Sequence, residues 1–326
     1  MRQINWGIIG CGNVTEKKSG PAFNKVAGSK LVAVMRRDAA KAEDYARRHN
    51  VPVWTTNAND IITNPDVNAV YIATPPGSHG DYAVRALEAG KPVYVEKPMA
   101  ADYTECIRMK KSADKAGLPL YVAYYRRFLP YFKKVGEILS SGLLGRIIYV
   151  KIDFHISPRK EDFNPESLPW RVKPEIAGAG YFYDLACHQL DLMEWYFGNP
   201  VHVEGAKYNR RELYSAEDLV FGHVGYESGV PLEASWCFAA GNSEHRDNIY
   251  IHGEKGTLEF STFDFTPIKL YTESLKEEYK PDNPENIQYW FIKNMVEELQ
   301  AAANYKGNAE TAVRTNWVMD KILGKI

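Results

Sequence analysis

The most constraining stretch of this sequence runs from Ile4 to Thr15 and reads Ile-Asn-Trp-Gly-Ile-Ile-Gly-Cys-Gly-Asn-Val-Thr. A short apolar run that ends in two glycines and opens into a polar, helix-starting segment is typical of a dinucleotide-binding unit. Gly10 and Gly12 let the turn be tight and let the backbone approach a pyrophosphate, which unpaired N–H groups at a helix N-terminus then hold. An ordinary turn is the alternative interpretation, but the position directly after a strand favours nucleotide binding.

The turn and the helix start that follows it supply the first expected cofactor contacts. Thr15 stands where the fingerprint G-x-G-x-x-G has its third glycine, which leaves its hydroxyl able to donate to a phosphate oxygen. The backbone expected around the phosphates comprises Gly10, Cys11, Gly12, Asn13 and Val14.

The residues after the second apolar run bear on the choice between NAD and NADP. Lys30 to Met35 is expected to be a buried parallel strand, and an acidic residue after it would hold the ribose 2′-hydroxyl of NAD. Arg36 and Arg37 occupy that place instead, and guanidinium groups favour phosphate through bidentate, charge-assisted hydrogen bonds. With Lys41 one helical turn further on, the pattern predicts a preference for NADP(H). A solvated loop is the alternative, and Asp38 leaves use of NAD(H) possible.

Two later loops are expected to line the rest of the cofactor. Ligands bind at the carboxyl ends of parallel strands, which places Thr74 and Pro75 beside the ribose and nicotinamide. His79 follows in the same loop and is expected among the residues that contact the cofactor. We expect it to have a structural role or to contact the helix N-terminus, and not to be a catalytic base. In Glu96-Lys97-Pro98, a lysine at a strand end can hydrogen-bond a reacting oxygen and stabilise alkoxide character, although most lysines are surface residues.

Length, charge and cysteine content narrow the class of protein. The 326 residues suit two domains, and 40 Lys and Arg residues nearly cancel 41 Asp and Glu residues. We therefore expect neither nucleic acid nor a membrane as a partner. The absence of a membrane-length apolar run and of a signal-peptide core predicts a cytoplasmic protein. Four cysteines without metal-ligand spacing predict buried free thiols and no metal site.

Short apolar runs alternate with helical segments over residues 1–123, which is typical of an α/β Rossmann domain with a doubly wound parallel sheet. Gly20 to Lys25 is expected to be a connecting segment between them. The expected strands after the glycine turn are 30–35, 51–55, 69–73, 93–95 and 120–123, and the expected helices are 39–50, 59–64, 80–89 and 103–116.

The pattern changes in residues 124–326, where a helix over 130–140 is followed by alternating strand candidates. This predicts an α+β domain with a large open, mostly antiparallel sheet, and the last helices are able to pack back on the first domain. One sheet face should carry helices and the other should pack on a partner subunit. The expected strands are 148–156, 201–208, 219–226, 231–239, 248–252, 257–260 and 268–272.

Glycines at 178 and 180 precede a segment that carries the second set of chemically active side chains. A helix that begins there puts Asp184 and His188 at i and i+4 on one face, with Asp191 three residues further along. A carboxylate, an imidazole that titrates near neutral pH and the positive charge of Lys97 form a proton-transfer set. A structural histidine in a helix is the alternative interpretation of His188 alone.

Together these motifs resemble the Gfo/Idh/MocA oxidoreductases, which include glucose-fructose oxidoreductase, inositol dehydrogenase and 1,5-anhydrofructose reductase. The resemblance spans the whole chain, and it implies a Rossmann domain, an open-sheet domain and homodimers or homotetramers built through sheet faces. The motifs that carry it are Gly10-x-Gly12, Glu96-Lys97-Pro98, Arg126-Arg127-Phe128, Trp170-Arg171, Gly178-x-Gly180-x-x-x-Asp184-x-x-x-His188 and Gly253-x-x-Gly256.

The resemblance also implies roles for individual residues. His188 is implied to be the acid/base at the substrate oxygen, Lys97 to polarise that oxygen and Asp184 to position a sugar. The tryptophan and arginine after Pro169 resemble a pair that reaches the cofactor in the anhydrofructose reductase branch. The further cofactor contacts implied are Glu96, Lys97, Tyr125, Trp170 and Arg171.

The sequence therefore predicts an NADP-dependent oxidoreductase that transfers hydride between a nicotinamide and a sugar or cyclic polyol. Two alternatives belong to other classes. A non-catalytic regulator of the same fold that senses nucleotide and sugar is disfavoured by the intact Lys97, Asp184 and His188. An NAD-dependent glycosidase with transient redox chemistry is disfavoured by Arg36 and Arg37.

Overall fold

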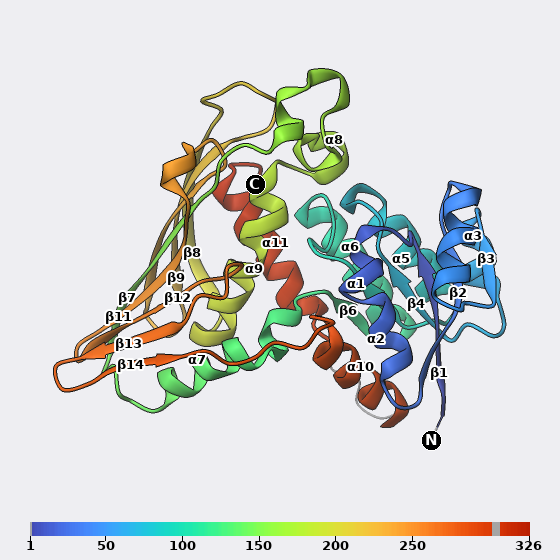
Figure 1. The fold of residues 1–326 in the computed structure, drawn as a ribbon, viewed down its shortest axis with the longest axis horizontal. Coiled ribbons are helices and arrows are strands. Elements are labelled where there is room, and N and C mark those ends of the chain that lie inside the picture. Colours follow the sequence, from blue (N-terminus) through green and yellow to red (C-terminus); the bar gives the residue numbers. More distant parts are fainter. Residues whose placement is uncertain (1, 302–306) are drawn as a thin grey trace. The chain divides into compact units, whose positions relative to one another are not determined.

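The computed structural model describes residues 2–301 and 307–326, which form two compact units (Figure 1). The first unit contains the chain through Tyr125 together with Pro284–Val313. The second contains Arg126–Asn283 and Arg314–Ile326. The chain therefore crosses between the units three times, and the first unit is built from two separate segments.

The first unit contains a six-stranded, wholly parallel sheet in the order β3-β2-β1-β4-β5-β6. This is the strand order of a doubly wound dinucleotide-binding domain, so the predicted fold of this half is confirmed. Its central strands are buried on both faces, as expected for a parallel sheet between layers of helices. The strands are β1 (Ile4–Ile9), β2 (Ser29–Met35), β3 (Val53–Thr55), β4 (Ala69–Ile72), β5 (Val93–Val95) and β6 (Leu120–Val122).

Helices connect these strands, and their ends follow the usual capping rules. Asp38 and Asp102 cap two of them by accepting hydrogen bonds from the backbone amides of Lys41 and Glu105. The helices are α1 (Asn13–Lys17), α2 (Gly20–Lys25), α3 (Ala39–Arg48), α4 (Ala58–Thr63), α5 (His79–Glu88) and α6 (Tyr103–Ala116), with a short 3₁₀ turn at Pro76–Ser78.

Helix α2 corrects one sequence prediction, because Gly20–Lys25 was expected to be a connecting segment. Pro21 lies in its first turn, where the missing N–H costs no hydrogen bond. Phe23 is fully buried, with its ring 4.9 Å from Trp6 and 5.4 Å from Tyr71. Burial of this one aromatic side chain against the sheet explains why six residues with a glycine at the start are helical.

The returning segment Pro284–Val313 adds helix α10 (Tyr289–Ala301) to the first unit. Phe291 of α10 lies edge-on to Tyr94 at 5.6 Å and to Tyr121 at 6.4 Å. Asn308 binds the backbone of β6 by accepting from the amide of Val122 and donating to its carbonyl. The hydrophobic core of the nucleotide-type domain thus includes residues almost two hundred positions away in the chain.

The second unit contains an eight-stranded sheet in the order β14-β13-β12-β11-β7-β10-β9-β8, in which only β7 and β10 pair in parallel. The predicted large, mostly antiparallel sheet is confirmed, and β14 is a further strand beyond those predicted from the sequence. The strands are β7 (Ile147–His155), β8 (Pro200–Tyr208), β9 (Leu219–Tyr226), β10 (Pro231–Cys237), β11 (Arg246–Gly253), β12 (Gly256–Phe260), β13 (Ile268–Thr272) and β14 (Lys276–Tyr279).

Two long helices cover one face of this sheet. Phe182 of α9 meets Trp236 of β10 at 5.0 Å, and Ile322 of α11 fills the space where a Cβ at Gly205 or Gly222 would stand. The helices of this part of the chain are α7 (Pro130–Ser140), α8 (Pro174–Ala177), α9 (Tyr181–Phe197) and α11 (Ala309–Ile322), with 3₁₀ turns at Tyr125–Phe128, Lys160–Phe163, Pro165–Ser167, Trp170–Val172 and Asn242–Glu244.

The residues that alternate with this buried face are partly exposed. Phe221 is 43% exposed, and charged neighbours such as Lys151, Asp153 and Glu233 lie on the same side of the central strands. The face is therefore both polar and aromatic. None of the helices in residues 2–301 and 307–326 combines the length and apolar character that crossing a bilayer requires.

Candidate functional site

The glycine turn after β1 is shaped by a close approach between two loops. Gly10 has a φ of +94°, a conformation that side-chain-bearing residues rarely adopt. A Cβ on Gly10 would stand 2.7 Å from the Cγ2 atom of Thr74 and 3.1 Å from the backbone of Ala73. The structure thus brings together the loops that follow β1 and β4, as expected for one ligand-binding edge of the sheet.

Some backbone amides of this turn donate hydrogen bonds within the described part of the protein, and others do not. Gly10 and Cys11 both donate to the carbonyl of Met35, and Gly12 donates to the hydroxyl of Thr15. Among the described residues, none accepts a hydrogen bond from the amide of Asn13 or Val14, the first two residues of α1. These two N–H groups are therefore available to an anion.

Thr15 corrects the expectation that its hydroxyl donates to a phosphate. Its side chain is completely buried, and its hydroxyl both accepts from the amide of Gly12 at 3.1 Å and donates to the Gly12 carbonyl at 2.9 Å. The hydroxyl is thus used to close the turn. Thr15 stands where the fingerprint has its third glycine, and its hydroxyl stabilises the start of α1.

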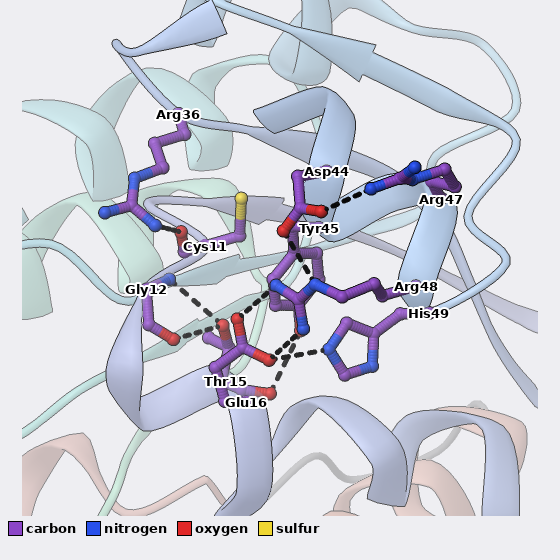
Figure 2. A network of polar contacts seen from close by, with 10 residues as sticks. All are labelled: Cys11, Gly12, Thr15, Glu16, Arg36, Asp44, Tyr45, Arg47, Arg48 and His49. Atoms are coloured by element: carbon purple, nitrogen blue, oxygen red, sulfur yellow. Dashed lines mark hydrogen bonds and ion pairs between the residues drawn. The ribbon is translucent and has the colours of Figure 1, made fainter. Parts of the chain in front are cut away.

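Arg36 is attached to the glycine turn by one hydrogen bond, from its Nη1 atom to the carbonyl of Cys11 at 3.2 Å (Figure 2). Arg37 is exposed beside it. Lys41 pairs with Asp38 at 3.1 Å on the first turn of α3, so a carboxylate already compensates its charge. The thiol of Cys11 is buried, which raises its pKa to about 11 and keeps it protonated.

A set of ion pairs ties the helix after the glycine turn to the end of α3. Glu16 receives two hydrogen bonds from Arg48, both at 2.8 Å, and faces His49 at 2.8 Å (Figure 2). The hydrogen bonds from Arg48 lower the pKa of Glu16 to about 2. Asp44 holds the other side of Arg48 at 2.7 Å.

His79 lies fully buried between two loops at the same edge of the sheet. Its Nε2 atom is 2.7 Å from the carbonyl of Thr74, and its Nδ1 atom is 3.1 Å from the carbonyl of Pro98 and 3.2 Å from that of Met99. Burial lowers the pKa of the imidazole, which favours the neutral form. The ring therefore joins the loops that follow β4 and β5, and contact with a cofactor would require it to move.

Glu96 and Lys97 follow β5, and Lys97 precedes a cis peptide bond to Pro98. The carboxylate of Glu96 is nearly buried and accepts hydrogen bonds from Tyr71 at 2.6 Å and from Gln288 at 2.8 Å. Its other oxygen lies 3.3 Å from the amide of Lys97. Lys97 itself is partly exposed, while Tyr125 at the end of the first unit is almost completely buried.

In the second unit, α9 carries Asp184 and His188 one turn apart, which confirms their expected spacing on a helix. Asp184 accepts a hydrogen bond from Nε of Arg171 at 2.9 Å. The guanidinium of Arg171 lies 4.4 Å from the ring centre of Trp170. His188 is 3% exposed and lies 6.0 Å from the ring of Phe263. The structure thus joins Trp170, Arg171 and Asp184 into one cluster.

The next two acidic residues along α9, Asp191 and Glu194, form buried ion pairs. Asp191 is 1% exposed and receives two hydrogen bonds from the guanidinium of Arg127, at 2.9 and 2.7 Å. Glu194 pairs with Arg314 of α11 at 2.8 Å. Asp191 was noted from the sequence only for its place on the helix face, and its partner stands in the motif Arg126-Arg127-Phe128. The pairing of the two was missed because no local spacing connects residues 64 positions apart.

Two family models match the chain. Residues 4–124 match a model described as an oxidoreductase family with an NAD-binding Rossmann fold. Residues 132–259 match a model described as the GFO/IDH/MocA C-terminal domain. The two matches together cover most of both units.

Curated relatives agree with these matches. Oxidoreductase P35 of Formosa agariphila is 41% identical over 322 residues, which cover 99% of this chain and 99% of that protein. The 1,5-anhydro-D-fructose reductase of Ensifer adhaerens is 26% identical, with 78% of this chain and 74% of that protein covered.

Solved structures share the fold. An aldose-aldose oxidoreductase from Caulobacter crescentus, complexed with glycerol, has a TM-score of 0.86 at 23% identity, with coverage of 98% of this chain and 96% of that one. A levoglucosan dehydrogenase in complex with NADH and levoglucosan also has a TM-score of 0.86, at 19% identity and the same coverage.

Proposed function

This chain belongs to the GFO/IDH/MocA family of oxidoreductases, and from that premise we propose that it transfers hydride between NADP(H) and one carbon of a sugar or cyclic polyol. The relatives named for anhydrofructose and levoglucosan support a carbohydrate CH–OH group as the reacting centre. The sequence motifs around Lys97 and His188 support the same reaction.

The single observation that carries the proposal is the glycine turn. Gly10 has no room for a Cβ, and the amides of Asn13 and Val14 have no acceptor in the described parts of the chain. An anion of pyrophosphate type fits this arrangement, because it would satisfy both amides at the start of α1. Thr74 borders the same turn and extends the surface on which the rest of a dinucleotide would lie.

Arg36 and Arg37 support NADP(H) rather than NAD(H). No acidic side chain stands directly after β2. One guanidinium nitrogen of Arg36, Nη1, donates to the carbonyl of Cys11 and orients the side chain, which leaves its other N–H groups to bind a phosphate. A guanidinium forms paired hydrogen bonds with a phosphate more readily than with a ribose hydroxyl. Lys41 contributes less, since Asp38 already pairs with it.

A bound nicotinamide dinucleotide would supply the hydride donor or acceptor. In the oxidative direction, we assign to His188 the removal of the hydroxyl proton while the C–H electron pair leaves the same substrate carbon as hydride. Lys97 supplies positive charge for the developing alkoxide. Asp184, held by Arg171 at 2.9 Å, would bind sugar hydroxyl groups at a fixed position.

The proposal is tested by titrating the purified protein with NADPH and NADH and then adding a panel of ketoses, aldoses and inositols. We expect NADPH to bind and to be oxidised by one class of carbonyl sugar, with loss of the nicotinamide absorbance. Tight binding without turnover on any sugar would favour the regulator. A cofactor that co-purifies in the NAD form, with cleavage of a glycoside, would favour the transient-redox glycosidase.

Replacement of His188 tests the acid/base assignment. We expect His188→Ala to lower turnover by about 10²- to 10⁴-fold, with little change in NADPH affinity, because only proton transfer is lost. His202→Ala is the matched control, since His202 is an exposed histidine of β8. Turnover within a few-fold of the natural protein would contradict the assignment.

Replacement of both Arg36 and Arg37 by alanine tests the cofactor preference. We expect NADPH affinity to fall by about 10- to 100-fold and NADH affinity to change little, because the loss concerns the 2′-phosphate. Arg47→Ala removes a similar charge from an exposed position on α3 and serves as the control. An equal loss for both nucleotides would show that the arginines do not contact that phosphate.

The partly exposed face of the second sheet further leads us to propose a homodimer or homotetramer formed through this face. Exposed aromatic side chains such as Phe221 are enriched in subunit interfaces, whose solvent-accessible rims also admit polar groups such as Glu233. Light scattering on the purified protein should therefore give at least twice the monomer mass, and Phe221→Lys should shift it toward the monomer. A monomer at micromolar concentration would overturn this proposal.

A further inference from the structure

Gln288 is a completely buried polar side chain that joins strand β5 and the residue after it to the returning segment. Its Oε1 atom accepts a hydrogen bond from the hydroxyl of Tyr94 at 2.6 Å. Its Nε2 atom donates to Oε1 of Glu96 at 2.8 Å. Gln288 and Glu96 are 192 positions apart in the chain, so no local pattern in the sequence connects them.

The orientation of this amide is fixed by chemistry. A carboxylate only accepts hydrogen bonds, so the NH₂ group of Gln288 must face Glu96 and its carbonyl must face Tyr94. Reversing the amide would place two oxygen atoms against each other in a buried site. Tyr94, Gln288 and Glu96 therefore form a directed chain of hydrogen bonds that ends on the carboxylate.

The carboxylate of Glu96 accepts three hydrogen bonds within the described part of the chain. Tyr71 and Gln288 both donate to Oε1, and the backbone amide of Lys97 donates to Oε2 at 3.3 Å. The side chain is only 7% exposed, so water can replace few of these partners. Removal of one donor leaves a buried negative charge with incomplete hydrogen bonding, which favours a change in the position of the carboxylate.

The backbone beside Gln288 is itself anchored to the segment that follows the glycine turn. The amide of Gln288 donates to the carbonyl of Lys18, and the side chain of Asn286 donates to the carbonyl of Lys17. Lys25 in turn donates to the Oδ1 atom of Asn286 at 2.7 Å. The chain from the end of α1 to the loop after β5 is therefore continuous through residues 286–288.

We propose that Gln288 is a positioning residue for hydride transfer, which holds the carboxylate of Glu96 and through it the backbone of Lys97. The inference rests on the proposed function, because Lys97 matters to catalysis only if the chain carries out that reaction. Gln288 acts at a distance from the reacting atoms. It keeps the loop after β5 in one position, and small displacements of a catalytic group cost up to about 10²-fold in rate.

Three variants test this role. Gln288→Met keeps the size of the side chain and removes both hydrogen bonds. Gln288→Glu keeps the donor only while the new carboxyl is protonated, since two neighbouring carboxylates share a proton and repel when both ionise. Gln300→Met is the control, because Gln300 lies on α10, the helix that Gln288 immediately precedes, and its side chain donates to the carbonyls of Arg2 and Gly28 rather than to the loop after β5.

We expect kcat of Gln288→Met to fall by about 10- to 100-fold at every pH, with a much smaller change in KM for the cofactor. The rate of Gln288→Glu relative to the natural protein should approach one at pH 6 and decline steadily toward pH 9. Titration of Tyr71, Tyr94 or His79, which lie around Glu96, would not produce this profile. Burial raises the pKa of Tyr71 and of Tyr94 well above the usual value, and it lowers that of His79.

Hydrogen exchange supplies a readout that does not depend on turnover. The amides of residues 93–101 should exchange faster in Gln288→Met and at the natural rate in Gln300→Met. If the natural protein lacks activity on every sugar, the proposed function fails while this exchange difference still stands. Natural turnover in Gln288→Met, a pH-independent ratio for Gln288→Glu or unchanged exchange in residues 93–101 would each overturn the positioning role.

Discussion

Two glutamates, one in each unit, lie at the same distance from an arginine, but their pKa values are shifted in opposite directions. Glu16 lies 2.8 Å from Arg48 in the first unit, and Glu194 lies 2.8 Å from Arg314 in the second. The pKa of Glu16 is lowered to about 2, chiefly by the hydrogen bonds from Arg48. Burial, which outweighs the pairing with Arg314, raises the pKa of Glu194 to about 7.

The difference between the two pairs lies in access to water. The side chain of Glu16 is 29% exposed, whereas that of Glu194 is 5% exposed. A charge near the surface keeps most of its hydration and gains the attraction of its partner, but a charge in the interior loses hydration that one arginine does not fully replace. The presence of an ion pair therefore does not by itself show which protonation state the fold favours.

The largest expected effect comes from breaking the buried pair. Arg314→Met should lower the free energy of unfolding by about 3 kcal/mol at pH 8, because it leaves Glu194 buried without its cation. The loss should be smaller at pH 6, where Glu194 can take up a proton. Urea titration at both pH values measures the effect, and Arg48→Met is the matched change at the exposed pair. Equal losses for the two variants would remove the distinction between the pairs.

Neutralising the buried acid should have an intermediate effect with a defined sign. The folded-state pKa of Glu194 lies above the unfolded value of about 4.5, so the folded state binds more protons between these values and loses stability as pH rises through about 7. As pH rises from 5 to 8, the free energy of unfolding of Glu194→Gln should therefore increase by about 1 to 2 kcal/mol relative to that of the natural protein. Thermal unfolding across that range measures it, and parallel curves for the two proteins would contradict it.

The smallest effect is expected at the exposed pair, with the opposite pH dependence. The folded-state pKa of Glu16 lies below the unfolded value, so its stabilisation is present above pH 4.5 and is lost as pH falls toward about 2. Glu16→Gln should cost less than about 1 kcal/mol at pH 7 and low salt. The cost should shrink on acidification and in 1 M salt. A cost that grows on acidification would show that burial also governs this pair.

Sequence patterns predicted the parts of the molecule that local rules determine. Alternation and apolar runs predicted both sheets, and the spacing around Gly10 predicted the turn whose φ of +94° the structure shows. The position of Asp184 and His188 on one helix followed from a four-residue interval. In each case the information lies within one element or one turn.

The parts that were missed depend on partners far away in the chain. Gln288 has no recognisable motif, and its role exists only because the segment from Pro284 returns to the first unit. The ion pair between Asp191 and Arg127 cannot be predicted from the sequence around either residue. The sequence left the hydroxyl of Thr15 able to donate to a phosphate, because its hydrogen bonds to Gly12 depend on the exact geometry of the turn. Long-range pairing therefore decides which polar side chains remain available to a ligand.

The discontinuous first unit has a consequence for synthesis on the ribosome. Domains encoded as one stretch can fold as soon as they emerge, at an elongation rate of about 5 to 20 residues per second. Here residues through Tyr125 emerge first, but Gln288, Phe291 and Asn308 are made only after the whole segment Arg126–Asn283. During that interval Tyr94 and Tyr121 lack the packing of Phe291, and the carbonyls of Lys17 and Lys18 lack the hydrogen bonds from Asn286 and Gln288. We therefore expect this nascent chain to expose apolar surface for longer than one whose nucleotide domain is contiguous.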